Sequence, residues 1–118
     1  MKKKIISNAY VIDTSAIIEK IPSSRVKDKS INSGNILIPH PVMAELESQA
    51  NKGKEIGLIG LEEIQEIREL TEKNKSLFLD FIGERPSDHQ IRYAKSGEID
   101  AYIRDLAHKN NAILITAD

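Results

Sequence analysis

The sequence contains no cysteine, few aromatic residues (4%) and no excess of one charge. The absence of cysteine excludes disulfide bonds, thiolate chemistry and cysteine-bound zinc. The 17 basic and 18 acidic residues leave a formal net charge of −1, so no overall charge attracts the chain to nucleic acid. Any binding of nucleic acid must therefore depend on a local site.

Long apolar runs are also absent. The basic start, residues 1–4, is followed by only two apolar residues before Ser7, which is too short for the apolar part of a secretory signal peptide. Nowhere does an apolar run approach the ~18 residues that a membrane-spanning helix needs. We therefore expect a soluble, cytoplasmic protein that has no membrane partner.

The composition that remains, 40% hydrophobic and 30% charged residues over a length of 118, suits one domain with an aliphatic core. Short apolar runs alternate with segments whose apolar residues recur at helical spacing. Buried strands are expected at 10–13, 35–38, 77–82 and 112–118, and helices at 14–22, 41–50, 56–74, 88–95 and 98–110. Strands that alternate with helices predict a three-layer α/β/α fold, in which a parallel sheet has helices on both faces.

One stretch does not fit this alternation. The apolar positions of the first expected helix end at Pro22, and residues 23–34 are polar apart from Val26 and Ile31. We expect a polar connection there, with or without a helical turn.

Four acidic residues fall where elements of such a fold end or begin. Asp13 follows the first strand, Glu45 lies about one turn into the helix after the second strand, and Asp118 ends the last strand. Asp100 lies in the first turn of the helix that leads back to the last strand. In a parallel sheet these positions share the carboxyl edge, where open α/β sheets bind their ligands.

Each acid also has a purely structural interpretation. Asp13 can cap the following helix, Glu45 can lie on a solvated helix face, and Asp100 can complement a helix dipole. Together, however, four carboxylates on one edge repel one another unless a cation binds between them. Carboxylate oxygens are the ligands of Mg²⁺ or Mn²⁺, which in such sites commonly act on phosphate substrates.

Other polar residues accompany these acids. Ser15 is placed to hold a metal-bound water or a phosphate oxygen, and Thr116 is placed to orient Asp118. Glu98 lies close enough to Asp100 to compete for the role of third metal ligand. His40 also follows the second strand, but we expect it to have a structural or solvent-facing role.

The same residues resemble the motifs of the PIN-domain nucleases. The matching runs, in chain order, are 11–15, 38–46, 100–103 and 114–118. The resemblance implies a PIN-like fold with strand order 3-2-1-4-5 and a Mg²⁺- or Mn²⁺-dependent endoribonuclease that hydrolyses phosphodiester bonds of single-stranded RNA. It also implies that the catalytic and metal-binding residues are Asp13, Glu45, Asp100 and Asp118, and that Ser15 is the catalytic hydroxyl.

The chain departs from the family pattern at its end. The family continues beyond the fourth acid into a helix and a fifth, edge strand, whereas this sequence stops at Asp118. We therefore expect the chain to be the N-terminal fragment of a longer protein. The motifs are most similar to archaeal PIN domains fused to an ATPase, which implies an ATPase domain in the full-length protein.

Two alternatives remain open. The chain could be a catalytically weak or inactive PIN-like module for RNA or protein contact and self-association within a larger ATPase assembly, which the missing edge strand and the balanced charge favour. It could also be a receiver or haloacid-dehalogenase-like phosphoryl-transfer domain, although Ser15 stands where the latter has its second acid. A Rossmann domain fits less well, because no glycine-rich turn follows the first strand.

Overall fold

Four parallel strands form the central sheet in the computed structural model, which describes residues 8–93 and 97–117. The strands are β1 (Ala9–Ile12), β2 (Gly34–Pro39), β3 (Leu77–Ile82) and β4 (Ile113–Ile115). Their order is β3-β2-β1-β4, with Val11 opposite both Leu37 and Leu114. Because all four run in the same direction, their carboxyl ends form one edge of the sheet.

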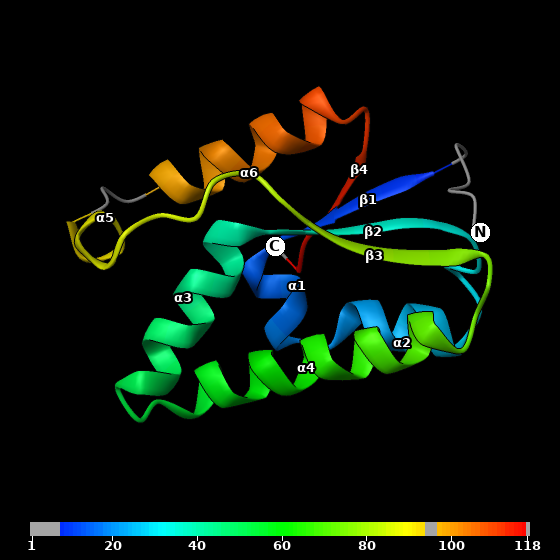
Figure 1. Ribbon diagram of the computed structural model, residues 1–118, viewed down its shortest axis with the longest axis horizontal. Helices are drawn as coiled ribbons and strands as arrows, with labels where there is room; N and C mark the ends of the chain where they lie inside the picture. The colour runs from blue at the N-terminus through cyan, green and yellow to red at the C-terminus, as the bar shows by residue number, and fades with distance from the viewer. Residues whose placement is uncertain (1–7, 94–96, 118) are drawn as a thin grey trace.

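Helices cover both faces of this sheet (Figure 1). One face carries α6, with α5 beside its start, and α1 to α4 lie on the other. The helices are α1 (Thr14–Ile18), α2 (Ile21–Lys27), α3 (His40–Asn51), α4 (Glu55–Glu72), α5 (Asp88–Tyr93) and α6 (Glu98–Lys109). The α/β class, the parallel sheet and its two helical layers are therefore as the sequence predicted, and the strand order agrees with the first four strands of the PIN pattern.

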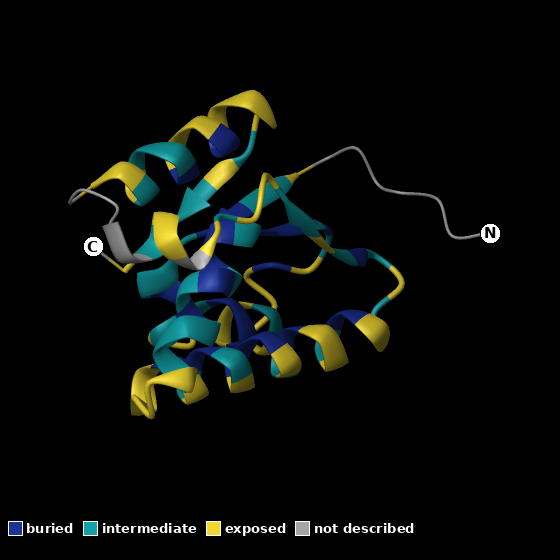
Figure 2. Cartoon of the chain, turned by 60° about the vertical axis from the view of Figure 1, so that its left-hand side comes forward, coloured by how far each residue is buried: buried dark blue, intermediate teal, exposed yellow. Residues whose placement is uncertain are grey.

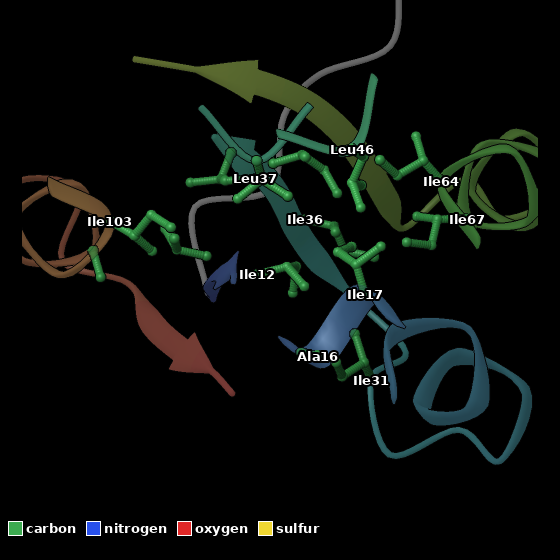
Figure 3. Packing of buried hydrophobic residues seen from close by; sticks show 14 of the residues in the cluster. Ile12, Ala16, Ile17, Ile31, Ile36, Leu37, Leu46, Ile64, Ile67 and Ile103 are labelled. Atoms are coloured by element: carbon green, nitrogen blue, oxygen red, sulfur yellow. The ribbon is translucent and has the colours of Figure 1, made fainter. Parts of the chain in front are cut away.

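Aliphatic side chains fill the space between these layers. Ile12, Ile17, Ile36 and Ile67 are fully buried and belong to one cluster on the side of α1 and α4. Figure 3 shows Ile103 of α6 on the opposite side of the central strands from Ile67. Strands covered on both faces need apolar residues at successive positions, which explains the uninterrupted apolar runs in the sequence.

The packing of α3 on α4 depends on two glycines. A Cβ atom at Gly57 would lie 2.2 Å from the backbone nitrogen of Ala50, and one at Gly60 would lie 2.3 Å from Cδ2 of Leu46. Both distances are far below van der Waals contact. At Gly57 the atoms met belong to the backbone and cannot move aside, whereas at Gly60 the side chain of Leu46 would have to shift. The contact fixes the position of α3 and thus of Glu45, while the outer side of α4 remains exposed (Figure 2).

The structure corrects the prediction for residues 14–34. The first helix ends at Ile18 rather than at Pro22, and the expected polar connection contains α2. Lys20 has a left-handed backbone (φ +60°) that separates the two helices, and Pro22 lies in the first turn of α2. Proline is well tolerated in a first turn because the amide it lacks would have no partner within the helix there.

The last strand is shorter than predicted. β4 ends at Ile115, so Thr116 and Ala117 follow the strand rather than belong to it, and Asp118 lies outside the described residues. Residues 94 and 95 of the expected helix 88–95 also lie outside them. In the described part of the chain, each helix is too short or too polar to span a bilayer.

Candidate active site

Asp13 stands at the carboxyl end of β1 and caps α1. Its Oδ1 accepts hydrogen bonds from the backbone N–H of Ala16 at 3.0 Å and from the hydroxyl of Ser15 at 2.7 Å. The cap is therefore Asp13 and not Thr14 or Ser15, the residues next to it. Because both bonds end on Oδ1, capping is compatible with a metal bond to the other carboxylate oxygen.

Ser15 connects Asp13 to the segment after β4. Its hydroxyl oxygen accepts a hydrogen bond from the backbone N–H of Ala117 at 3.1 Å and lies 3.3 Å from the hydroxyl oxygen of Thr116. Since the only hydroxyl proton of Ser15 points to Asp13, Thr116 is the donor in that second contact. The Ser15 hydroxyl thus orients Asp13 and holds the end of β4 against the start of α1. A backbone hydrogen bond adds to this contact: the N–H of Asp13 donates to the carbonyl oxygen of Ile115 at 3.1 Å.

Glu45 is brought to the same edge by α3. The hydroxyl of Thr14 donates a hydrogen bond to its Oε1 at 3.1 Å, across 31 positions of sequence. Burial raises the pKa of the Glu45 carboxyl, the bond from Thr14 opposes this rise, and the negative charge of Asp100 adds to it. The site therefore disfavours the charged form of Glu45, as expected for a carboxyl group that is partly buried and lies in the field of another acid.

Asp100 and Glu98 occupy different surroundings although both lie in the first turn of α6. The charge of Asp100 acts on Glu45, whereas Glu98 lines a separate cavity with Tyr102. The choice between Asp100 and Glu98 as the third acid stays a prediction. The fourth acid predicted from the sequence, Asp118, lies outside the described residues, so its position relative to the other three stays a prediction.

The donors at this edge fit a hard cation. They are carboxylate and hydroxyl oxygens, the types that Mg²⁺ and Mn²⁺ prefer. Among residues 8–93 and 97–117, no three acidic or histidine side chains are placed as a ready metal site. The chemistry of the donors fits the ion, and a complete ligand set would need Asp118 or water in addition.

A cleft opens beside the hydroxyls of this site. It has a volume of about 630 Å³ and is lined by Ser15, Thr116, Ile18, Ile21 and other residues of the same segments. An elongated substrate could therefore approach Ser15 from the side of α1 and the end of β4.

Comparison with known proteins places this geometry in a family. Residues 10–118 match the model of the PIN domain. The chain belongs to the PIN-domain family. PIN domains are generally nucleases that use divalent metals, so the acidic edge described above lies in a domain of that general class.

This PIN domain has relatives in Methanocaldococcus jannaschii. An uncharacterised KH- and PIN-domain-containing protein of that organism is 38% identical over 114 residues, which cover 97% of this chain and 18% of the relative. The chain thus spans less than a fifth of the length of the curated relative that it matches. The solved structure of a domain of a functionally unknown protein from the same organism has a TM-score of 0.90 and 38% identity, over 95% of this chain and 79% of that one.

Sequence reasoning did not identify two features of this edge. The sequence pattern assigned Thr14 no part in the site, yet its hydroxyl joins α1 to Glu45. Its place between Asp13 and Ser15 is the one signal that could have suggested a role. The cavity that Glu98 and Tyr102 share had no signal, because its walls come from segments far apart in the sequence.

Proposed function

We propose that this PIN domain is a metal-dependent endoribonuclease that hydrolyses phosphodiester bonds of single-stranded RNA. The observation that carries the proposal is a pair of hydrogen bonds from the first turn of α1, from the Thr14 hydroxyl to the half-buried Glu45 and from the Ser15 hydroxyl to Asp13. They hold two carboxyl groups at one edge of the sheet, where burial and the charge of Asp100 raise the pKa of Glu45. Such an arrangement costs stability, and a divalent cation bound there would remove the cost.

We propose Asp13, Glu45, Asp100 and Asp118 as the residues that hold Mg²⁺ or Mn²⁺. The bound ion would activate a water molecule and offset the charge that develops on the phosphate. Asp13 is oriented for this role by the hydroxyl of Ser15. Thr14 holds Glu45 toward the same edge by its hydrogen bond. We assign the catalytic hydroxyl to Ser15, which acts by orienting Asp13.

The relatives support RNA as the substrate and a larger protein as the context. The curated relative is named for a KH domain as well as a PIN domain, and KH domains clamp single-stranded nucleic acid. The chain spans 18% of that relative, which supports the proposal that residues 1–118 are one module of a longer protein. An ATPase domain, self-association and a cytoplasmic location stay predictions, since the relative's name mentions none of them.

The direct test is cleavage of single-stranded RNA with Mg²⁺ or Mn²⁺. We expect cleavage by the unaltered chain and its loss in EDTA and in Asp13→Asn. Asp105→Asn is the matched control, because it makes the same chemical change at an exposed position of α6 away from the first turn. Equal cleavage by the unaltered chain and Asp13→Asn would rule out the proposed role of Asp13.

A binding measurement separates the nuclease from an inactive module. A ligand that binds only the folded state stabilises it, by about 2.7 kcal/mol at one hundred times its dissociation constant. We therefore expect Mn²⁺ to raise the midpoint of thermal unfolding of the unaltered chain and of Asp105→Asn, but not of Asp13→Asn. If Mn²⁺ leaves all three midpoints unchanged, the non-catalytic module for RNA or protein contact becomes the better reading.

A further inference from the structure

A second cavity, here called the Tyr102 pocket, lies next to the acidic edge. Its volume is about 290 Å³, and its walls include Pro41, Ile99, Tyr102, Glu84, Arg85 and Glu98. Ile99 directly precedes Asp100 in α6, and Pro41 lies one helical turn, about 6 Å along the axis, before Glu45 in α3. The pocket and the acidic site therefore share the starts of the same two helices.

The ring of Tyr102 is held in place by the loop after β3. The backbone N–H of Glu84 donates a hydrogen bond to the Tyr102 hydroxyl oxygen at 2.9 Å. Gly83 has a left-handed backbone (φ +81°), and a Cβ atom there would lie 3.0 Å from that oxygen. The left-handed backbone favours glycine at this position, and the hydrogen bond holds the aromatic side chain of Tyr102 in the wall of the pocket.

The pocket brings together charged groups of both signs. Arg85 forms a salt bridge of 2.7 Å from its Nη1 to Glu47, which leaves further N–H donors on the guanidinium. Glu84 and Glu98 contribute carboxylates, which only accept hydrogen bonds when charged, and Gln90 contributes an amide. Because the carboxylates outnumber the guanidinium, the pocket disfavours a phosphate. It suits a neutral flat group that has both hydrogen-bond donors and acceptors.

We propose that the Tyr102 pocket binds a guanine base of the RNA strand whose phosphodiester lies at the acidic site. This inference rests on the proposed function for its substrate. Guanine presents two N–H donor groups on its Watson–Crick edge, which match a carboxylate, and the acceptors O6 and N7, which match a guanidinium. Adenine and cytosine place a ring acceptor beside their amino group, where it would repel a carboxylate. Stacking on Tyr102 supplies the affinity that all bases share.

The test uses free nucleosides, so that neither metal nor phosphate contributes. Guanosine, adenosine, cytidine and uridine are titrated into the ¹⁵N-labelled 118-residue chain in EDTA, and the backbone amide signals of Glu84 and Ile99 are followed by NMR. A good bidentate contact discriminates against the wrong base by at least about fivefold, so we expect guanosine to bind about tenfold more tightly than the other three.

Two variants and a control make the assignment specific. Glu98→Gln and Arg85→Gln are expected to reduce the guanosine preference to about one- to twofold, because each removes one half of the match. Glu62→Gln, an exposed glutamate of α4, should keep the full preference. Unchanged amide signals with every nucleoside, equal affinities for the four, or a preference that survives both variants would each overturn the proposal.

The proposal and the nuclease assignment fail separately. Guanosine preference without metal-dependent RNA cleavage would refute the proposed function and leave the pocket assigned as a base-binding site. Cleavage that is lost in Asp13→Asn, together with equal binding of the four nucleosides, would refute the pocket alone.

Discussion

The close approach of α3 and α4 gives a prediction whose size can be worked out from the structure. In Gly60→Ala, the new Cβ would lie 2.3 Å from Cδ2 of Leu46, against an ordinary contact of 3.4–4 Å. Leu46 is 1% exposed and has no space into which to retreat. Overpacking of this kind costs about 1–3 kcal/mol. The replacement of a helical glycine by alanine returns about 1 kcal/mol, so we expect a net loss of up to about 2 kcal/mol.

The sign of this effect should reverse when Leu46 is truncated. Leu46→Ala alone leaves a cavity and is expected to cost about 2–5 kcal/mol. In that background the methyl group of Gly60→Ala has no side chain to strike and fills part of the cavity, so it should stabilise the protein by about 1 kcal/mol. The two changes are therefore expected to be non-additive by about 1–3 kcal/mol, which lies within the range for residues in contact.

Urea unfolding of the four proteins, followed by circular dichroism at 222 nm, measures this coupling. Gly57→Ala is the matched control, because its Cβ would meet backbone atoms, at 2.2 Å from the Ala50 nitrogen and 2.7 Å from the Leu46 carbonyl oxygen. Truncation of the Leu46 side chain cannot relieve those contacts. A Gly60→Ala cost that is the same in both backgrounds, within about 0.5 kcal/mol, would refute the reasoning about helix approach.

Two further predictions concern single carboxyl groups. Because burial and the charge of Asp100 raise the pKa of Glu45, its folded form binds a proton over a pH range in which the unfolded chain has lost it, so stability falls as pH rises through that range. In EDTA, Glu45→Gln should therefore be more stable than the unaltered chain at pH 7 and lose this advantage toward pH 4. Urea unfolding at both pH values measures the difference, and a difference in midpoints that does not change with pH would contradict the prediction. Ser23→Ala should destabilise the protein by about 1–3 kcal/mol at 25 °C, because the Ser23 hydroxyl donates a hydrogen bond at 2.7 Å to the carboxylate of Glu63, which is 2% exposed. Ser24→Ala, at an exposed position, is the control. If the two variants lose the same stability, Glu63 does not need this donor.

The layered fold could be read from the sequence because its signals are local. Near-continuous apolar runs such as 77–82, in which Asp80 is the one polar residue, occur where helices cover both faces of a strand, and β3 has those same bounds. The failure at residues 14–34 has an equally local cause. A proline can follow the end of one helix or lie in the first turn of the next. The left-handed backbone at Lys20 places Pro22 in the first turn of α2, and a lysine gives no sequence signal for that conformation.

The candidate site could be predicted only in outline. The positions of Asp13 and Asp100 at element ends follow from the direction of a parallel sheet and its crossover helices. The sequence could not choose between Glu98 and Asp100, because two residues in one helical turn differ only in the neighbours that they face. In the fold the charge of Asp100 acts on Glu45 and Glu98 lines the Tyr102 pocket, while the choice of third ligand stays a prediction.

By itself, then, the sequence determined the class of fold and the family resemblance, because spacing and residue type suffice for both. Tertiary structure alone decided how Asp13 and Glu45 are held. The bond from Thr14 to Glu45 spans 31 positions, and the contact of Ser15 with Thr116 spans 101. Such contacts depend on how closely α3 packs on α4 and on how β4 pairs with β1, and these distances are set by the packing of the whole core rather than by any local pattern.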